Sequence, residues 1–133
     1  MKILIVEDDY TSRIVLHGML KAHGECDLAE NGEQAVEAFR AALEAGSPYD
    51  LICLDIMMPG MDGQAVLERI RAMEKEKGRI MLDAAKVMMT TALEDSRNIM
   101  RSFRSQCDAY LVKPVDKDRL LDNLRALGLL ADG

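Results

Sequence analysis

The chain has 133 residues, 49% of them hydrophobic, and a net charge of −6, which suits one domain large enough to bury its own core. It has no apolar run near the roughly 20 residues of a membrane-spanning helix, no signal-peptide pattern and no cluster of basic residues. We therefore expect a cytoplasmic protein without membrane insertion. Direct binding to nucleic acid is not expected either, because phosphate recognition needs grouped Lys and Arg side chains.

The first strand and the first helix are predicted at the N-terminus. Lys2–Val6 forms an almost unbroken apolar run, as expected of a strand covered on both faces of a parallel sheet. It is followed by three carboxylates, Glu7-Asp8-Asp9. Thr11 or Ser12 is then expected to cap a helix that ends at Gly24. The buried side of this helix is predicted at Ile14, Val15, Met19 and Ala22.

The middle of the chain predicts two more strands with a helix between them. Glu25–Ala29 has mixed polarity, which favours a strand at the edge of the sheet, and Asn31-Gly32 opens the next helix. Residues 51–54 are wholly apolar and too few for a helix, so they predict a buried strand that carries Asp55 at its C-terminal tip. The Pro/Gly/Asp loop that follows must turn the chain sharply.

The rest of the chain continues the alternation of strands and helices. A helix after Gly63 is expected to end in a solvated charged segment, residues 74–77. The later elements are a strand at 86–89 followed by Thr90-Thr91-Ala92, a helix from Glu94, a strand at 109–112 followed by Lys113-Pro114, and a helix capped by Asp116. This alternation predicts an α/β fold with a five-stranded parallel sheet and five helices on its two faces.

Polar side chains fall at the C-terminal tips of four of these strands: Glu7 and Asp8, Asp55, Thr91, and Lys113. In a parallel sheet these tips lie at one edge, where ligands bind. Carboxylates brought this close raise one another's pKa or require a cation, and Mg²⁺ is the hard cation that suits a few carboxylates together with a phosphoryl oxygen. With a lysine and a hydroxyl opposite, such a site can hold a phosphoryl group on an aspartate.

Four motifs, in this order and spacing, resemble the response-regulator receiver domain of two-component signalling: Glu7-Asp8, the segment LDIMMPGMDG around Asp55, Thr91-Ala92, and Lys113-Pro114. The resemblance covers essentially the whole chain and implies one receiver domain over residues 1–133. It also implies a flavodoxin-like, CheY-like sheet with the strand order 2-1-3-4-5.

The resemblance implies a role for each site residue. Asp55 would accept a phosphoryl group from a sensor histidine kinase or a phosphotransfer protein. Asp8 and Asp55 would bind Mg²⁺ directly, Glu7 would bind it through water, and Met57 would offer its backbone carbonyl. Lys113 would contact the phosphoryl oxygens as a catalytic residue. The protein would then be a phosphoacceptor that assists its own phosphorylation and dephosphorylation, and not an enzyme in the usual sense.

The same resemblance implies a switch. Thr91, the second catalytic residue, would swing toward the phosphoryl group, Tyr110 would change rotamer with it, and the Lys113-Pro114 peptide bond would be cis. An unknown protein target would then bind the face built from the fourth helix, the fifth strand and the fifth helix. Because the sequence ends soon after the last predicted helix, we expect a stand-alone receiver that acts on a partner protein, or a fragment of something longer.

Two other functions are compatible with parts of this pattern. A haloacid-dehalogenase-like phosphatase also uses an aspartate at a strand tip with Mg²⁺, but it carries a second aspartate two residues later, where this chain has Met57. A receiver-like interaction module that is never phosphorylated is the other alternative. The complete set of Glu7, Asp8, Asp55, Thr91 and Lys113 argues against it.

Overall fold

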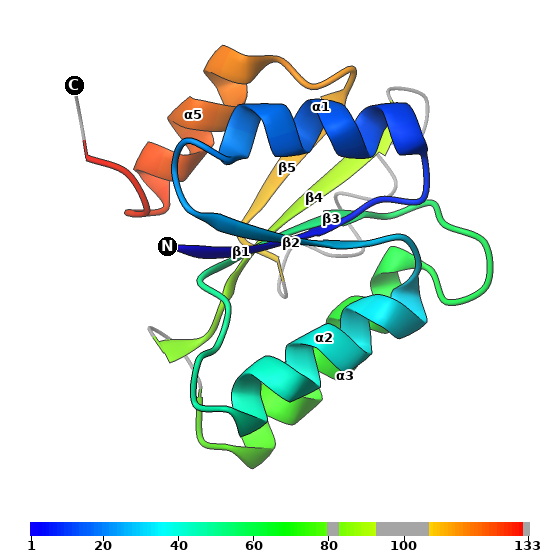
Figure 1. Ribbon diagram of the computed structural model, residues 1–133, viewed down its shortest axis with the longest axis vertical. Coiled ribbons are helices and arrows are strands. Elements are labelled where there is room, and N and C mark those ends of the chain that lie inside the picture. The colour runs from blue at the N-terminus through cyan, green and yellow to red at the C-terminus, as the bar shows by residue number, and fades with distance from the viewer. Residues whose placement is uncertain (80–82, 93–106, 132–133) are drawn as a thin grey trace.

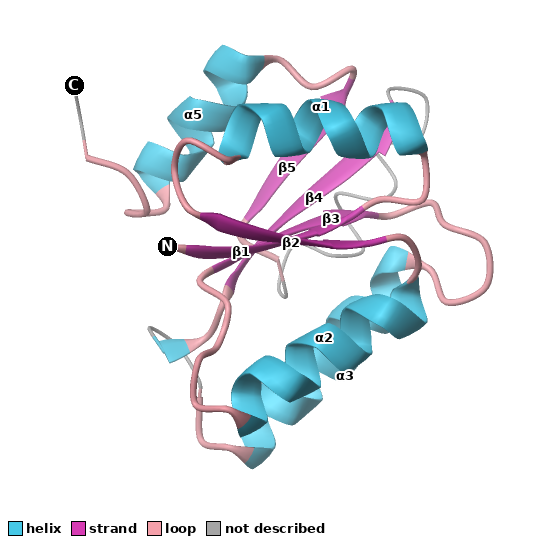
Figure 2. Ribbon diagram, in the orientation of Figure 1, coloured by secondary structure: helices cyan, strands magenta, loops and turns pink. Residues whose placement is uncertain are grey.

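The structure is a computed structural model, and it describes residues 1–79, 83–92 and 107–131. The fold has three layers, with one sheet between two layers of helices (Figures 1 and 2). Helices α1 (Tyr10–Leu20) and α5 (Lys117–Ala126) cover one face, and α2 (Gly32–Glu44) and α3 (Gly63–Glu76) cover the other. The described residues thus contain four of the five expected α-helices. The helix predicted from Glu94 lies outside them.

The sheet confirms the predicted fold class and strand order. Its five strands are all parallel and are arranged β2-β1-β3-β4-β5. Their bounds are β1 Lys2–Val6, β2 Glu25–Ala29, β3 Leu51–Asp55, β4 Lys86–Ala92 and β5 Ala109–Lys113. The fourth strand continues past its predicted end at residue 89, because Thr91 and Ala92 still pair with Val112 and Lys113 of β5.

Each face of the sheet has its own hydrophobic core. On the side of α2 and α3, the core includes Phe39, Leu54 and Val66, and on the side of α1 and α5 it includes Leu20, Cys53 and further leucines. All five residues of β3 are buried, as the uninterrupted apolar run of this strand predicted. The side chains at the C-terminal edge of the sheet are therefore carried by strands packed between two hydrophobic cores.

The first helix differs from its prediction in both cap and buried face. Asp9 is the cap, since its Oδ2 accepts a hydrogen bond from the Ser12 amide at 2.8 Å, and the predicted caps lie inside the helix. Ile14 and Val15, predicted to be buried, are 47% and 45% exposed. Met19 packs partly against the core, and Ala22 lies beyond the end of the helix. The helix instead buries Arg13, Leu16 and Leu20. The spacing of apolar residues did not identify this face, because one of its three buried residues, Arg13, is charged.

The end of α3 is also less solvated than predicted. The Glu74 side chain is only 2% exposed, and its Oε2 accepts a hydrogen bond from the Ala85 amide at 2.6 Å. Its Oε1 lies 2.8 Å from Nη1 of Arg71, which also donates to the Ala85 carbonyl at 2.8 Å. A buried carboxylate needs such partners. Glu74 therefore ties the end of α3 to the segment that enters β4.

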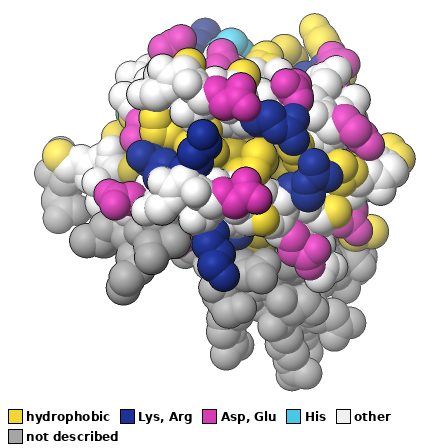
Figure 3. Space-filling view, turned by 90° about the horizontal axis from the view of Figure 1, so that it is seen from below, with side chains coloured by type: hydrophobic (Ala, Val, Ile, Leu, Met, Phe, Trp, Pro, Cys, Tyr) yellow, Lys and Arg dark blue, Asp and Glu magenta, His cyan; other side chains and the backbone are white. Residues whose placement is uncertain are grey.

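Figure 3 shows the outer face of the α2/α3 layer, where hydrophobic side chains are exposed between Lys or Arg and Asp or Glu side chains. A cavity of about 210 Å³ between the two helices is lined by Arg40, Leu43, Glu44, Met73, Glu76 and Lys77. None of the helices in the described part of the chain is long and apolar enough to cross a membrane.

Candidate functional site

Three carboxylates meet at the C-terminal ends of β1 and β3. Because Val6 pairs with Leu54 in the sheet, Glu7 and Asp8 leave β1 beside Asp55. One oxygen from each of the three carboxylates lies within 4.8 Å of the other two. Glu7 and Asp55 are buried, at 0% and 3% exposure, whereas Asp8 is exposed. The structure thus brings together the three acidic residues that the sequence singled out.

Lys113 reaches this group from the end of β5. Its Nζ lies 2.8 Å from Oε2 of Glu7 and 3.3 Å from Oδ2 of Asp55. Burial alone would lower the pKa of Lys113, but its interactions with Glu7 and Asp55 outweigh burial and raise that pKa. Lys113 is therefore a positive charge held between two buried carboxylates. The peptide bond that follows it, to Pro114, is cis, as predicted.

The electrostatics of Asp55 are unusual for an aspartate. Burial, followed by the negative charge of Glu7, raises its pKa to about 7, although Lys113 acts in the opposite direction. Without a cation, the carboxyl therefore keeps its proton to higher pH than an exposed aspartate does. A cation bound among the three carboxylates would favour the ionised, nucleophilic form, because it supplies the charge that lowers the pKa of its neighbours.

The loop after β3 holds one oxygen of Asp55. The amide of Met57 donates to Oδ1 of Asp55 at 3.3 Å, while the Met57 side chain points out and is 59% exposed. Asp62 caps the next helix by accepting a hydrogen bond from the Ala65 amide at 3.0 Å. The backbone of Met57 thus lies next to Asp55. The contact of its carbonyl with a metal stays a prediction.

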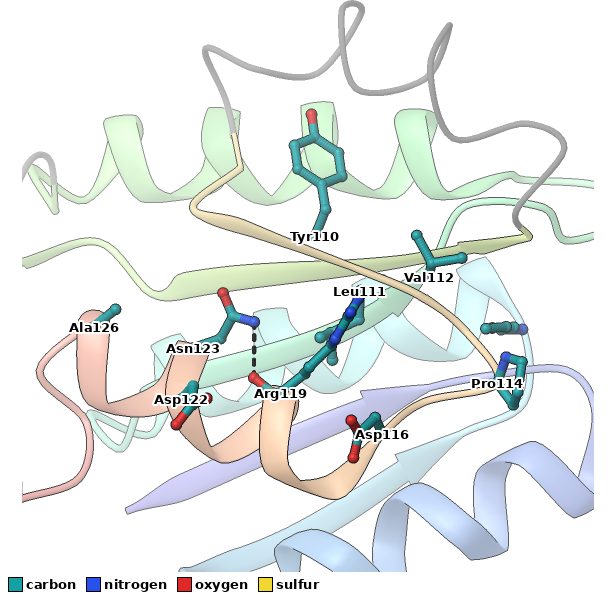
Figure 4. A pocket seen from close by; sticks show the side chains of 10 residues that line it. Tyr110, Leu111, Val112, Pro114, Asp116, Arg119, Asp122, Asn123 and Ala126 are labelled. Atoms are coloured by element: carbon teal, nitrogen blue, oxygen red, sulfur yellow. Dashed lines mark hydrogen bonds between the residues drawn. The ribbon is translucent and has the colours of Figure 1, made fainter. Parts of the chain in front are cut away.

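Thr91 and Tyr110 occupy the two strands on the other side of Asp55. Thr91 is completely buried near the end of β4, and its hydroxyl lies 3.4 Å from the Ala92 carbonyl, a long hydrogen bond. Among the described residues, no hydrogen bond joins it to Asp55. Tyr110 packs against the core on the α2/α3 side, and its side chain projects away from α5 (Figure 4). Their role as a switch stays a prediction.

Gly63 ends the LDIMMPGMDG motif, and from the sequence alone it has no role in the site beyond the start of a helix. Its amide donates to the Ile56 carbonyl at 2.9 Å. A Cβ atom at this position would lie 2.6 Å from the carbonyl oxygen of Asp55 and 2.7 Å from Cα of Ile56. The start of α3 therefore approaches the backbone of Asp55 as closely as a residue without a side chain allows. The Asp62-Gly63 pair was the available signal in the sequence.

We expect Gly63→Ala to destabilise the fold by about 1–3 kcal/mol, because the added methyl group displaces the backbone of Asp55. The reaction with acetyl phosphate should also slow. Urea unfolding and intact mass measure the two effects. Gly18→Ala is the matched control, since nothing lies within 4 Å of its Cβ and it sits on the exposed side of α1. It should be neutral or stabilising. Equal stabilities for the two variants would contradict the close approach at Gly63.

The donor set fits a hard divalent cation. Its three carboxylates offer only oxygen ligands, which is the set that Mg²⁺ binds, together with water and a phosphoryl oxygen. Oε2 of Glu7 is a buried oxygen whose charge is met by Lys113 alone among the described residues. The Asp8 carboxylate is exposed and has no hydrogen-bond or ion-pair partner in the described part of the chain. Of the three carboxylates, Asp8 is thus the one most open to a metal.

The comparison with protein families agrees with this geometry. The model of the response regulator receiver domain matches residues 3–125. The chain therefore belongs to the response-regulator receiver family, whose members are the CheY-like phosphoacceptor domains of two-component signalling.

Individual relatives support the assignment. The chain is 37% identical over 127 residues to the transcriptional regulatory protein ResD of Bacillus subtilis, covering 95% of this chain and 47% of ResD. It thus spans about half the length of that relative. Among solved structures, the complex of CheX with CheY, BeF₃ and Mg²⁺ from Borrelia burgdorferi matches with a TM-score of 0.79 and 26% identity, over 96% of this chain and 89% of that one. The complex of the histidine phosphotransfer protein Ypd1 with the receiver domain of Ssk1, from Saccharomyces cerevisiae, matches with a TM-score of 0.78 and 27% identity. This match covers 99% of this chain and 93% of that one.

Proposed function

We propose that this receiver is a switch in which Asp55 takes a phosphoryl group from the histidine of a sensor kinase or phosphotransfer protein. The observation that carries the proposal is the surrounding of Asp55: a buried carboxylate at a strand tip, two further carboxylates with oxygens within 4.8 Å, and Lys113 at 3.3 Å. Asp8, Asp55 and the carbonyl of Met57 would hold Mg²⁺ directly, and Glu7 would hold it through water.

In the transfer, an oxygen of Asp55 attacks phosphorus, and the bond from phosphorus to the donor breaks, with its electron pair leaving on the donor. Mg²⁺ held by Asp8 and Asp55 would supply positive charge to the phosphoryl oxygens. Lys113 supplies a second charge from its fixed position between Glu7 and Asp55. The Thr91 hydroxyl would turn toward the phosphoryl group. Water attack on the same phosphorus would later restore the carboxylate, which is the dephosphorylation that the domain assists.

The output is proposed to come from the edge of the sheet next to Lys113. A groove of about 660 Å³ runs between β5 and α5, and its lining includes Tyr110, Lys113 and Arg119 (Figure 4). Movement of Thr91 and Tyr110 after phosphorylation would shift the population of two arrangements of this face. The face of β5, α5 and the helix predicted from Glu94 would then bind a downstream protein.

The surface beside the site suits a protein donor. Large apolar side chains are exposed at Tyr10, Ile14 and Val15 of α1 and at Met57, two residues after Asp55. A cavity of about 210 Å³ runs from Val15 of α1 to Pro114 and reaches Glu7 and Lys113. The receiver domain of Ssk1 binds the histidine phosphotransfer protein Ypd1, which supports a phosphotransfer protein as a partner of this chain.

We expect Val15→Asp to slow transfer from a protein donor at least about tenfold, because a charge replaces an apolar contact in a desolvated interface. The reaction with acetyl phosphate should stay unchanged. Rates are compared with a histidine kinase or phosphotransfer protein that phosphorylates the wild-type chain. Ala41→Asp, on the exposed side of α2, is the control and should transfer normally. Equal losses from both donors would mean that the substitution damages the site itself.

The proposed function is tested by the intact mass of the chain after incubation with acetyl phosphate, with and without Mg²⁺. One phosphoryl group gained only with Mg²⁺ is the expected result. A chain that binds Mg²⁺ but accepts a phosphoryl group neither from acetyl phosphate nor from any kinase would support the silent interaction module instead. The cytoplasmic location, the single domain over residues 1–133 and the stand-alone organisation stay predictions.

A further inference from the structure

Arg13 is a buried cation that the proposed reaction does not use. It lies on the core side of α1 with Leu16 and Leu20 and is only 7% exposed. An arginine is seldom buried to this extent unless its guanidinium group has specific partners. Its partners are therefore informative.

The guanidinium group of Arg13 connects the ends of two strands. Its Nη1 donates to the backbone carbonyl of Glu7 at 2.9 Å, in a buried hydrogen bond. Its Nη2 lies 3.4 Å from Oε1 of Glu30, just after β2, and this carboxylate is 62% exposed. The Tyr10 ring lies on the guanidinium, with 5.5 Å between Cζ and the ring centroid. The Glu7 carbonyl is thus the buried partner, and Glu30 is the solvated one.

The Glu7 carbonyl belongs to the peptide that leads to Asp8. A peptide group is planar, so a hydrogen bond that fixes its oxygen also fixes the direction in which the next Cα leaves the strand. The other groups of Glu7 are fixed as well. Its amide donates to the Ala29 carbonyl at 3.1 Å, and its Oε1 accepts from the Asp9 amide at 3.2 Å.

Asp8 depends on this peptide for its position. Among the described residues its carboxylate has no hydrogen-bond or ion-pair partner, yet it offers an oxygen to the cluster with Glu7 and Asp55. The charges that shift the pKa of Asp55 are those of Glu7 and Lys113, so Arg13 is not a counter-charge of the phosphoacceptor. Its contribution is geometric.

We propose that Arg13 is a positioning residue of the metal site: by holding the Glu7-Asp8 peptide plane, it keeps the Asp8 carboxylate beside Asp55 before a cation binds. The inference rests on the proposed function, since it assigns Arg13 a part in Mg²⁺ binding. Groups that orient metal ligands in this way commonly change metal affinity 10–100-fold when they are replaced.

The test compares Arg13→Met with Arg13→Lys, Glu30→Gln and Leu20→Val. We expect the dissociation constant of Mg²⁺, measured by calorimetry without any phosphoryl donor, to rise at least about tenfold in Arg13→Met. Arg13→Lys keeps the charge and one donor, so it should restore part of the affinity. Glu30→Gln removes only the exposed ion pair and should stay within about twofold of wild type. Leu20→Val disturbs the apolar packing at the far end of α1 and should also leave Mg²⁺ binding unchanged.

A second readout does not need the metal. In the metal-free protein, Arg13→Met should shift the backbone amide resonances of Asp8 and Asp9 more than Leu20→Val does. Unshifted resonances, a Mg²⁺ affinity within twofold of wild type, or an equal loss of affinity in Leu20→Val would each overturn the role of Arg13. These outcomes leave the proposed function intact if the wild-type chain binds Mg²⁺ and is phosphorylated. A wild-type chain that fails to bind Mg²⁺ overturns the metal site and with it this inference.

Discussion

Asp55→Asn is expected to gain no phosphoryl group from acetyl phosphate and Mg²⁺ under conditions in which the wild-type chain gains one. An amide lacks the carboxylate oxygen that attacks phosphorus, and the other two acidic residues of the cluster are placed for a metal or for Lys113. Intact mass measures the difference. Asp122→Asn removes a carboxylate that is 75% exposed on α5 and should be phosphorylated as the wild type is.

Asp55→Asn should also change how the free energy of unfolding depends on pH. The pKa of Asp55 is about 7 in the folded chain and 3.8 in an unfolded reference, so only the folded state keeps this proton between these pH values. A proton bound preferentially by the folded state makes the free energy of unfolding fall as pH rises from about 4 to 7. One pKa unit corresponds to about 1.4 kcal/mol, so this group costs the metal-free protein up to a few kcal/mol above pH 7.

Asp55→Asn removes that cost. Measured by urea unfolding in EDTA at pH 8, it should be more stable than the wild type by about 1–3 kcal/mol, and the gap should close near pH 4. Mg²⁺ should stabilise the wild type more than the variant, because it binds the folded carboxylates. A phosphoryl adduct on Asp55→Asn would place the acceptor elsewhere. An unchanged pH dependence would contradict the raised pKa.

The sheet and the residues at its edge could be predicted because they follow from local patterns. Residues 51–54 are apolar on both faces of a strand, and Asp55 comes directly after them, so both the strand and the carboxylate at its tip were visible in the sequence. Lys113 was placed by the same reasoning. The side chains at these tips meet because parallel strands end at one edge, a consequence of the fold that needs no knowledge of individual contacts.

The features that could not be predicted from the sequence depend on contacts that form only when the fold brings separate segments together. Arg13 looks like a solvent-facing residue between Ser12 and Ile14, and its burial depends on the carbonyl of Glu7. Glu74 looks like part of a charged helix end, and its burial depends on the Ala85 amide. Gly63 looks like a helix start, and its closeness to Asp55 depends on how α3 turns back on β3. In each case the deciding contact is with a backbone group that has no signature in the local sequence.

Lys113→Met should lower the rate of phosphorylation about 10²–10³-fold at saturating Mg²⁺ and acetyl phosphate. The variant keeps the length of the side chain but removes the charge that lies 3.3 Å from Asp55. Loss of one such electrostatic contact has an effect of this size in enzymes. Single-turnover rates from intact mass measure it. Lys117→Met, on the exposed start of α5, is the control and should react normally.

Lys113→Met should also make the metal-free protein more sensitive to pH. Without the lysine, Glu7 and Asp55 stay buried with no counter-charge, and the pKa of Asp55 moves further above its unfolded value. At pH 8 the variant should therefore be less stable than the wild type by about 2–4 kcal/mol. This difference should become smaller at acid pH, where the carboxylates are protonated.

The double variant with Asp55→Asn separates the two partners of the lysine. If Lys113 acts mainly on Asp55, Lys113→Met should lower the free energy of unfolding much less in the Asp55→Asn background than in the wild type. An equal cost in both backgrounds would assign the lysine to Glu7, the closer partner at 2.8 Å. In that case Lys113 would stabilise the buried Glu7 carboxylate and not the carboxylate of Asp55. Its effect on the phosphorylation rate would then come from the position of its charge relative to the phosphoryl group.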